Sequence, residues 1–358
     1  ANYNFNDEPV KGVLEAQITN KTLGWETVAL ADFGLDVDLF DNKLSVTADY
    51  YIKNTKDILL GYNVPAETGI WTKPVMNLAK VRNTGFELAA TYRNKIGDLS
   101  YSVSGNIATN NNEIVTLAGS DNMIQNGGDV VRYILKEGEA IGSYYGLKAI
   151  GIYRTQADLD RVNANGQKIL QNNQEPQLGD IMYEDIDNNG NINDADRTVI
   201  GNPFPKMQYS FNLGFSYKDF DVNTFWQGIA GVYRYNWDET TISNGGNKTS
   251  RWLDRWSESN PDGSMPRLGG TINNNYSSFW LTKGDYLRLK NLEIGYTFRQ
   301  REFLTKLGVQ SLRLYLAGTN LLTFTSLDDY DPEKLSTDSR NDVHPNTRTY
   351  SFGVNVKF

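Results

Sequence analysis

The sequence contains no cysteine, and it has a single histidine, His344, among 358 residues. The absence of cysteine excludes a disulfide framework, a thiolate-bound metal site and thiol catalysis. One imidazole cannot supply a metal site built from several histidines, and His344 is expected to be an ordinary loop residue. Apolar runs are short, as in Ile58-Leu59-Leu60, so no helix long enough to span a bilayer is expected.

Positive charge is also in short supply. The chain has 35 Lys and Arg against 43 Asp and Glu, which gives a formal net charge of −8. This balance argues against nucleic acid as a partner. Aromatic residues, in contrast, make up 12% of the chain, and glycine is present 32 times. An excess of both without cysteine favours an all-β protein with one face towards lipid.

Apolar and polar residues alternate with a period of two in many segments. Residues 44–52 carry most apolar side chains at even positions, and residues 209–217 carry them at odd positions. This is the pattern of a strand with one apolar face. The alternation predicts nine antiparallel strands, near residues 27–40, 43–53, 80–93, 99–109, 207–218, 219–228, 285–298, 311–321 and 349–358. Its phase changes at Lys290-Asn291, which predicts a β-bulge there.

Short and long connections alternate along the chain. Short turns are expected at residues 41–42, 94–98 and 218–219, and large extracellular loops at residues 54–79, 110–206, 229–284 and 322–348. Short turns on one side and long loops on the other are typical of an outer-membrane β-barrel. Residues 1–26 are then an extracellular loop and lead-in, and residues 27–358 are the C-terminal portion of the barrel.

The same alternation predicts the direction of the strands. If the short turns are periplasmic, the last strand ends at Phe358 in the periplasm. Nine strands cannot close an even-numbered bacterial barrel, and a bare strand edge in lipid would leave backbone groups unpaired. We therefore expect the chain to be part of a larger barrel. The alternating Tyr350, Phe352, Val354, Val356 and Phe358 also resemble the C-terminal signature of such barrels.

Several segments resemble one protein family in the same order along the chain. They are residues 23–27, 49–57, 81–88, 179–196 with 200–205, 252–266, 277–280 with 285–291, and 319–323 with 330–333. The family is the SusC/RagA-type TonB-dependent transporters of the Bacteroidota outer membrane. The resemblance implies a barrel of about 22 strands with a plugged lumen, the plug domain being absent from this chain.

The resemblance also implies a function. It is TonB-dependent import of an oligosaccharide or a peptide across the outer membrane, with a SusD-like lipoprotein as the lid and TonB acting through the plug. No residue pair is placed for acid–base chemistry, so no enzymatic activity is expected. The alternative is a secreted or surface-attached β-sandwich module for carbohydrate binding or adhesion.

An acidic loop carries the sharpest local pattern. It fits D-x-[DN]-x-[DN]-G followed by five residues and an acid, with candidate metal ligands at Asp185, Asp187, Asn189, Asn191, Asn193 and Asp196. Ca²⁺ takes roughly six to eight oxygens, and spacing by two turns alternate side chains inward. The closing acid is Asp rather than Glu, and no amphipathic helices flank the loop. The alternative is an exposed Asx/Gly-rich turn without metal.

Three tryptophans in the predicted outer loops are candidates for contact with cargo or with the lid. Trp252, Trp256 and Trp280 lie near the basic residues Arg251, Arg255 and Lys283. Exposed rings beside polar groups suit contact with carbohydrate or peptide. Alternatively, Trp252 and Trp256 pack together on one turn of a loop helix.

Overall fold

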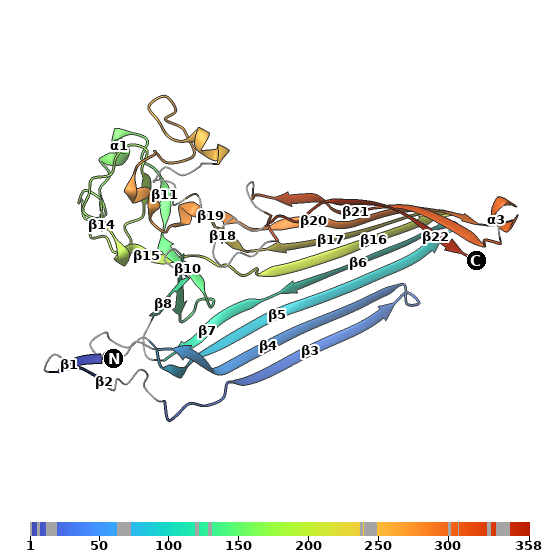
Figure 1. Ribbon diagram of the computed structural model, residues 1–358, viewed down its shortest axis with the longest axis horizontal. Helices are drawn as coiled ribbons and strands as arrows, with labels where there is room; N and C mark the ends of the chain where they lie inside the picture. The colour runs from blue at the N-terminus through green and yellow to red at the C-terminus, as the bar shows by residue number, and fades with distance from the viewer. Residues whose placement is uncertain are drawn as a thin grey trace.

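A computed structural model describes residues 2–5, 8–11, 20–62, 73–118, 122–127, 131–236, 239, 249–299, 302–306, 308–327, 331–333 and 344–358. Its main feature is one sheet of long antiparallel strands, with smaller elements gathered at one end of the sheet (Figure 1). In the part of the chain that is described, no helix is long and apolar enough to cross a bilayer.

Nine strands form the main path of the sheet, in the order β22-β21-β20-β17-β16-β6-β5-β4-β3. They are β3 (Thr27–Leu39), β4 (Leu44–Gly61), β5 (Val75–Ile96), β6 (Leu99–Thr109), β16 (Met207–Tyr217), β17 (Phe220–Ala230), β20 (Tyr286–Arg299), β21 (Ser311–Thr325) and β22 (Thr349–Lys357). Each pairs antiparallel with its neighbours. The nine predicted strands are confirmed.

The connections separate by length as predicted. Tight turns lie at one end of the sheet, and there Asp41 and Asn42 adopt φ angles of 54° and 63°, which these short polar residues tolerate. The short helix α3 (Glu302–Lys306) joins β20 to β21 at this end (Figure 1). The long connections lie at the opposite end, where β1 (Asn2–Phe5) and β2 (Glu8–Lys11) also form a small hairpin.

The two faces of the sheet differ in chemistry. One, the apolar face, exposes large side chains that no other part of the described chain covers: Phe33, Leu35, Phe86, Ile107, Phe215, Leu316 and Phe352. The other, the polar face, carries Asp36, Asp49, Glu87, Ser104, Asn212 and Asn223 at the alternate positions. An uncovered apolar face suits lipid on the outside of a barrel. A β-sandwich would instead bury that face against a second sheet.

Parts of the wall are longer than the alternation predicts. β4 continues to Gly61 and β5 begins at Val75, so the prediction of a loop over all of 54–79 is wrong. Within 110–206, β7 (Asn111–Leu117) extends the sheet by pairing with β5. Apolar side chains of these segments pack into a cluster of their own: Leu78, Ala79, Val81, Ile114, Leu117 and Leu135. Their burial there removes the simple alternation on which the prediction depends.

The predicted β-bulge is confirmed. The register between β20 and β21 shifts between Leu289 and Asn291. On β17 the register with β20 shifts between Phe225 and Trp226. Lys290 is the extra residue of the bulge, and as a result the consecutive residues Lys290 and Asn291 both lie on the polar face while pairing of the strand continues on either side.

Tyrosine rings cover glycines of the neighbouring strand on the polar face. Tyr51 lies opposite Gly85, and Tyr315 lies opposite Gly353. A Cβ atom on Gly353 would collide with the Tyr315 ring. This close approach explains why glycine occupies a strand interior, where it is otherwise unfavourable.

We expect Gly353→Val to destabilise the pairing of β22 with β21. The added side chain must displace the Tyr315 ring, and overpacking of this kind costs about 1–3 kcal/mol. The measurement is the temperature at which the folded band of the detergent-solubilised whole protein disappears from an SDS gel. Ser351→Val, at an exposed position on the same face and strand, is the matched control and should change that temperature little. Equal melting of the two variants would contradict the ring–glycine contact.

Candidate functional site

Two long connections fold together beyond the end of the sheet. We call this body the outer subdomain; it comprises residues 143–202, 232–236 and 249–285. Its strands are β10 (Ser143–Leu147), β11 (Ala149–Ile152), β12 (Leu170–Gln171), β13 (Ile181–Tyr183), β14 (Asn191–Ile192), β15 (Arg197–Gly201), β18 (Tyr233–Tyr235) and β19 (Leu281–Lys283). The helix α1 (Gln156–Leu159) also belongs to it. Figure 1 shows α1, β10, β11, β14, β15, β18 and β19 gathered at the long-loop end.

One hydrophobic core joins the two connections. The first contributes Tyr144, Leu147, Ile169, Ile181, Tyr183 and Ile192, and the second contributes Tyr235, Trp252, Met265, Ile272, Tyr276 and Trp280. The rings of Tyr235 and Tyr276 are in contact, with centroids 4.1 Å apart. Burial raises the pKa of the Tyr183 and Tyr276 hydroxyls, so both rings stay uncharged in the core. The core is shared, and each connection depends on the other to cover its apolar side chains.

A buried carboxylate links the same two connections. Asp180 is fully buried, and it accepts hydrogen bonds from Arg267 Nε at 2.7 Å and from Asn273 Nδ2 at 3.2 Å. Asn273 Oδ1 in turn accepts from the Ile181 backbone N–H at 2.7 Å. Because a buried charge is tolerated only when it is paired and hydrogen-bonded, Asp180 ties the second connection to the first. Sequence reasoning missed this residue, although it lies within one of the family segments.

Two of the three tryptophans, Trp252 and Trp280, are packing residues in the core of the subdomain. Trp252 and Trp280 are only 7% and 4% exposed, and they stack with centroids 6.3 Å apart. Trp252 Nε1 donates to the buried Glu239 carboxylate, and Trp280 Nε1 donates to the Asn273 carbonyl at 3.0 Å. The Trp256 ring lies against Gly179. The burial of Trp252 and Trp280 leaves these two rings little surface for a ligand, whereas contact of the half-buried Trp256 with cargo or with the lid stays a prediction.

The acidic loop brings its three carboxylates together. One oxygen each of Asp185, Asp187 and Asp196 lie within 4.8 Å of one another. Gly190 has a φ of 80° and donates its N–H to Asp185 Oδ2 at 3.0 Å. The buried Asp196 accepts from the N–H groups of Ile186 and Asn193, each at 2.8 Å. Asp185 Oδ1 is buried and has no hydrogen-bond partner among the described residues.

The three asparagines of the loop play a different part. Asn189 Oδ1 accepts from the Asn191 N–H at 2.7 Å, and Asn193 Oδ1 accepts from the Ala195 N–H at 2.8 Å. Asn191 Oδ1 accepts from Asn173 N–H at 2.8 Å, and β14 pairs in parallel with β12. These contacts hold the backbone of the loop in place. The structure thus brings the three carboxylates among the six candidate ligands together, and the side chains of the three asparagines accept hydrogen bonds from backbone N–H groups of the subdomain.

The single two-faced sheet, its tight turns at one end and a folded body at the other define the wall of an outer-membrane β-barrel with elaborated outer loops. The family model described as TonB dependent receptor-like, beta-barrel matches residues 2–321. The chain belongs to this family of TonB-dependent receptor β-barrels.

Individual relatives agree with this assignment. TonB-dependent receptor P3 of Formosa agariphila is 34% identical over 370 residues, covering 98% of this chain and 36% of the relative. TonB-dependent receptor SusC of Bacteroides thetaiotaomicron is 24% identical, covering 95% of this chain and 32% of the relative. The RagAB peptide importer in its closed-closed state superposes over 100% of this chain and 38% of the solved chain, with a TM-score of 0.73 and 26% identity. The chain thus spans about a third of the length of these proteins.

We expect Trp252→Ala to loosen the outer subdomain and to leave the wall intact. Removing a buried aromatic ring costs about 3–5 kcal/mol, whereas the neighbouring Leu253 is 82% exposed and Leu253→Ala is the matched control. Limited proteolysis of the whole protein in detergent should cut residues 143–285 of the Trp252 variant faster than those of the control. Equal cleavage rates in the two variants would place Trp252 outside the core of the subdomain.

Proposed function

We propose that the whole protein imports an oligomeric nutrient across the outer membrane and that TonB supplies the energy. The observation that carries the proposal is the family match over residues 2–321, on a sheet whose apolar face suits lipid and whose polar face suits a lumen. In this orientation the tight turns and Phe358 lie in the periplasm and the outer subdomain faces the medium. No catalytic role is proposed for any residue.

The polar face supports an oligosaccharide or a peptide as the cargo. Its central strands carry neutral amide and hydroxyl groups, which can pair with sugar hydroxyls or with peptide groups: Ser102, Ser104, Asn106, Asn212 and Asn223. One relative's structure is that of a peptide importer, RagAB. Both cargo classes are therefore part of the proposal.

Two partners complete the proposal. A SusD-like lipoprotein would cover the long-loop end, where the outer subdomain offers a preformed body for it to contact. TonB would act through a plug domain outside this chain. The supporting observation is the similarity to SusC and to the RagAB importer over almost the whole of this chain.

The transport proposal predicts that cells lacking the gene lose uptake. We expect a deletion strain to lose periplasmic accumulation of a fluorescent oligosaccharide pool or of a fluorescent peptide pool, and a plasmid copy to restore it. Loss of TonB should have the same effect, because import is energised. Normal uptake of both pools in the deletion strain would refute the proposal.

We further propose that the acidic loop binds Ca²⁺ through Asp185, Asp187 and Asp196. Three clustered carboxylates repel one another, and the buried Asp185 Oδ1 has no protein partner among the described residues; a divalent cation would offset both costs. The role is structural. The ion would brace the loop between β13 and β15 within the outer subdomain, where weak affinity suffices outside the cell.

We expect chelation of Ca²⁺ to make the outer subdomain of the purified whole protein more sensitive to protease. At free Ca²⁺ about tenfold above the dissociation constant, binding stabilises the bound form by roughly 1.4 kcal/mol. Asp185→Asn should remove the difference between Ca²⁺ and chelator. Asp160→Asn, which removes a carboxylate of the same subdomain beside α1, should keep it. A Ca²⁺ effect that persists in Asp185→Asn would disprove the site.

A further inference from the structure

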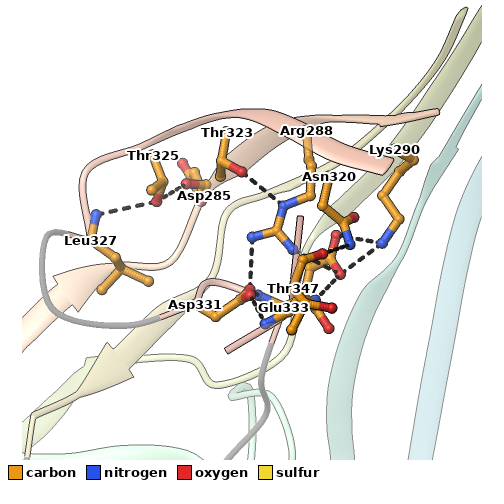
Figure 2. A network of polar contacts seen from close by, with 11 residues as sticks. Asp285, Arg288, Lys290, Asn320, Thr323, Thr325, Leu327, Asp331, Glu333 and Thr347 are labelled. Carbon is orange, nitrogen blue, oxygen red and sulfur yellow. Dashed lines mark hydrogen bonds and ion pairs between the residues drawn. The ribbon is translucent and has the colours of Figure 1, made fainter. Parts of the chain in front are cut away.

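Four charged side chains form a network where the last long connection meets the sheet (Figure 2). Arg288 and Lys290 belong to β20, and Asp331 and Glu333 belong to the connection from β21 to β22. Arg288 Nη2 lies 2.8 Å from Asp331 Oδ1, and Arg288 Nη1 lies 3.2 Å from Glu333 Oε2. Lys290 Nζ lies 2.9 Å from the same Glu333 oxygen. The side chains of Arg288 and Asp331 are 5% and 4% exposed.

The network is electrically balanced, because two cations meet two carboxylates. Burying charge is costly unless each ion is paired and its hydrogen-bonding capacity is used. Burial alone would raise the pKa of Asp331, but the hydrogen bonds from Arg288 and from the N–H groups of Asn346 and Glu333 outweigh it and hold that pKa below its usual value. The carboxylate is therefore ionised at neutral pH, and the network is intact there.

The wall holds the cationic half of the network in place. Arg288 Nε donates to Thr323 Oγ1 on β21 at 2.9 Å. Its neighbours Leu287 and Leu289 project to the opposite, apolar face, where their cross-strand partners include Phe324 and Trp226. Arg288 therefore projects from the polar face of a strand whose other side is covered with apolar groups. This arrangement fixes where the guanidinium lies.

Asp331 and Glu333, the acidic half of the network, bind both described ends of the connection to Arg288. These ends are the outgoing limb, residues 331–333, and the returning limb, residues 344–348. Asp331 Oδ1 accepts from the Glu333 N–H at 3.0 Å, which fixes the bend around Pro332. On the returning limb, the Asn346 N–H donates to Asp331 Oδ2 and Asn346 Nδ2 donates to Glu333 Oε2, each at 2.6 Å. The outgoing and returning limbs are thus joined to each other and to β20 by the same two carboxylates.

We propose that Arg288 and Lys290 are positioning residues that hold Asp331–Glu333 as a ledge on the polar face. If the polar face lines the lumen, as the proposed function requires, the ledge narrows the path at its outer end. The two carboxylates of the ledge are paired with Arg288 and Lys290. The ledge therefore offers passing cargo a surface without net charge. The narrower path and the contact with cargo rest on the proposed transport function, whereas the ledge itself does not.

The test is hydrogen exchange of the whole protein in detergent. We expect Asp331→Asn to leave Arg288 without its buried partner and to raise exchange at residues 344–348 by at least about tenfold. Exchange in β3 to β6 should stay the same. Glu184→Gln, which breaks an exposed ion pair with Lys148 at 2.7 Å, is the control and should not affect residues 344–348.

Unchanged exchange at 344–348 in both Asp331→Asn and Arg288→Met would overturn the ledge. Cells carrying Asp331→Asn at normal surface levels are then tested for uptake of the pool that the unsubstituted protein transports. We expect uptake at low cargo concentration to fall, because the displaced ledge no longer presents its surface to the cargo. Faster exchange with normal uptake would refute the contact with cargo. If the unsubstituted protein transports neither pool, the proposed function is refuted. The hydrogen-exchange result still tests whether Arg288 and Lys290 hold Asp331–Glu333 in place.

Discussion

The continuous antiparallel ladder from β3 to β22 is the constraint on which the other features depend. A bilayer offers no partner to a backbone N–H or C=O group, so each strand of the wall must satisfy its neighbours along its whole length. Several local features serve this pairing. Left-handed turn residues at Asp41-Asn42 let strands reverse tightly, Gly353 makes room for the Tyr315 ring, and the bulge at Lys290 changes the phase of β20 without ending it.

Outside the membrane, water can pair with backbone groups, so the strands need not form a continuous sheet. There the connections are held together by hydrophobic packing. The connections between β6 and β16 and between β17 and β20 share one core, with Asp180 bound to Arg267 and Asn273 as the polar link between them. A body assembled from two connections is fixed to the wall at four strand ends. It can therefore present a stable surface to a partner, and a cation in the acidic loop would brace the segment between β13 and β15, whose Ile192 belongs to this shared core.

Sequence patterns predicted the strands of the wall wherever one face of a strand is apolar and the other polar. In such a strand each successive residue must be apolar or polar in turn, so the alternation is visible in the sequence. They failed at Ile58 to Gly61, Val75 to Ala79 and β7, where packing in a second cluster removes the alternation. The acidic loop was readable because its carboxylates are close in sequence. The burial of Trp252 and Trp280, the Asp180–Arg267 pair and the Arg288–Asp331 pair depend on partners far apart along the chain, 87 residues in one pair and 43 in the other. No local pattern contains such contacts.

The outer connections are held in two physically different ways. The two longest bury enough apolar surface to form a core, and hydrophobic packing of that kind is non-directional and tolerant of small shifts. The described part of the connection between β21 and β22 has few apolar residues to contribute, and it is held by directional ion pairs to Arg288 and Lys290. A buried ionic network loses its stability when a single partner is lost, since the remaining charge is left uncompensated. Loss of Asp331 or Arg288 therefore removes the main polar contacts of residues 331–333 with the wall, whereas the outer subdomain keeps the rest of its shared core when one side chain is lost.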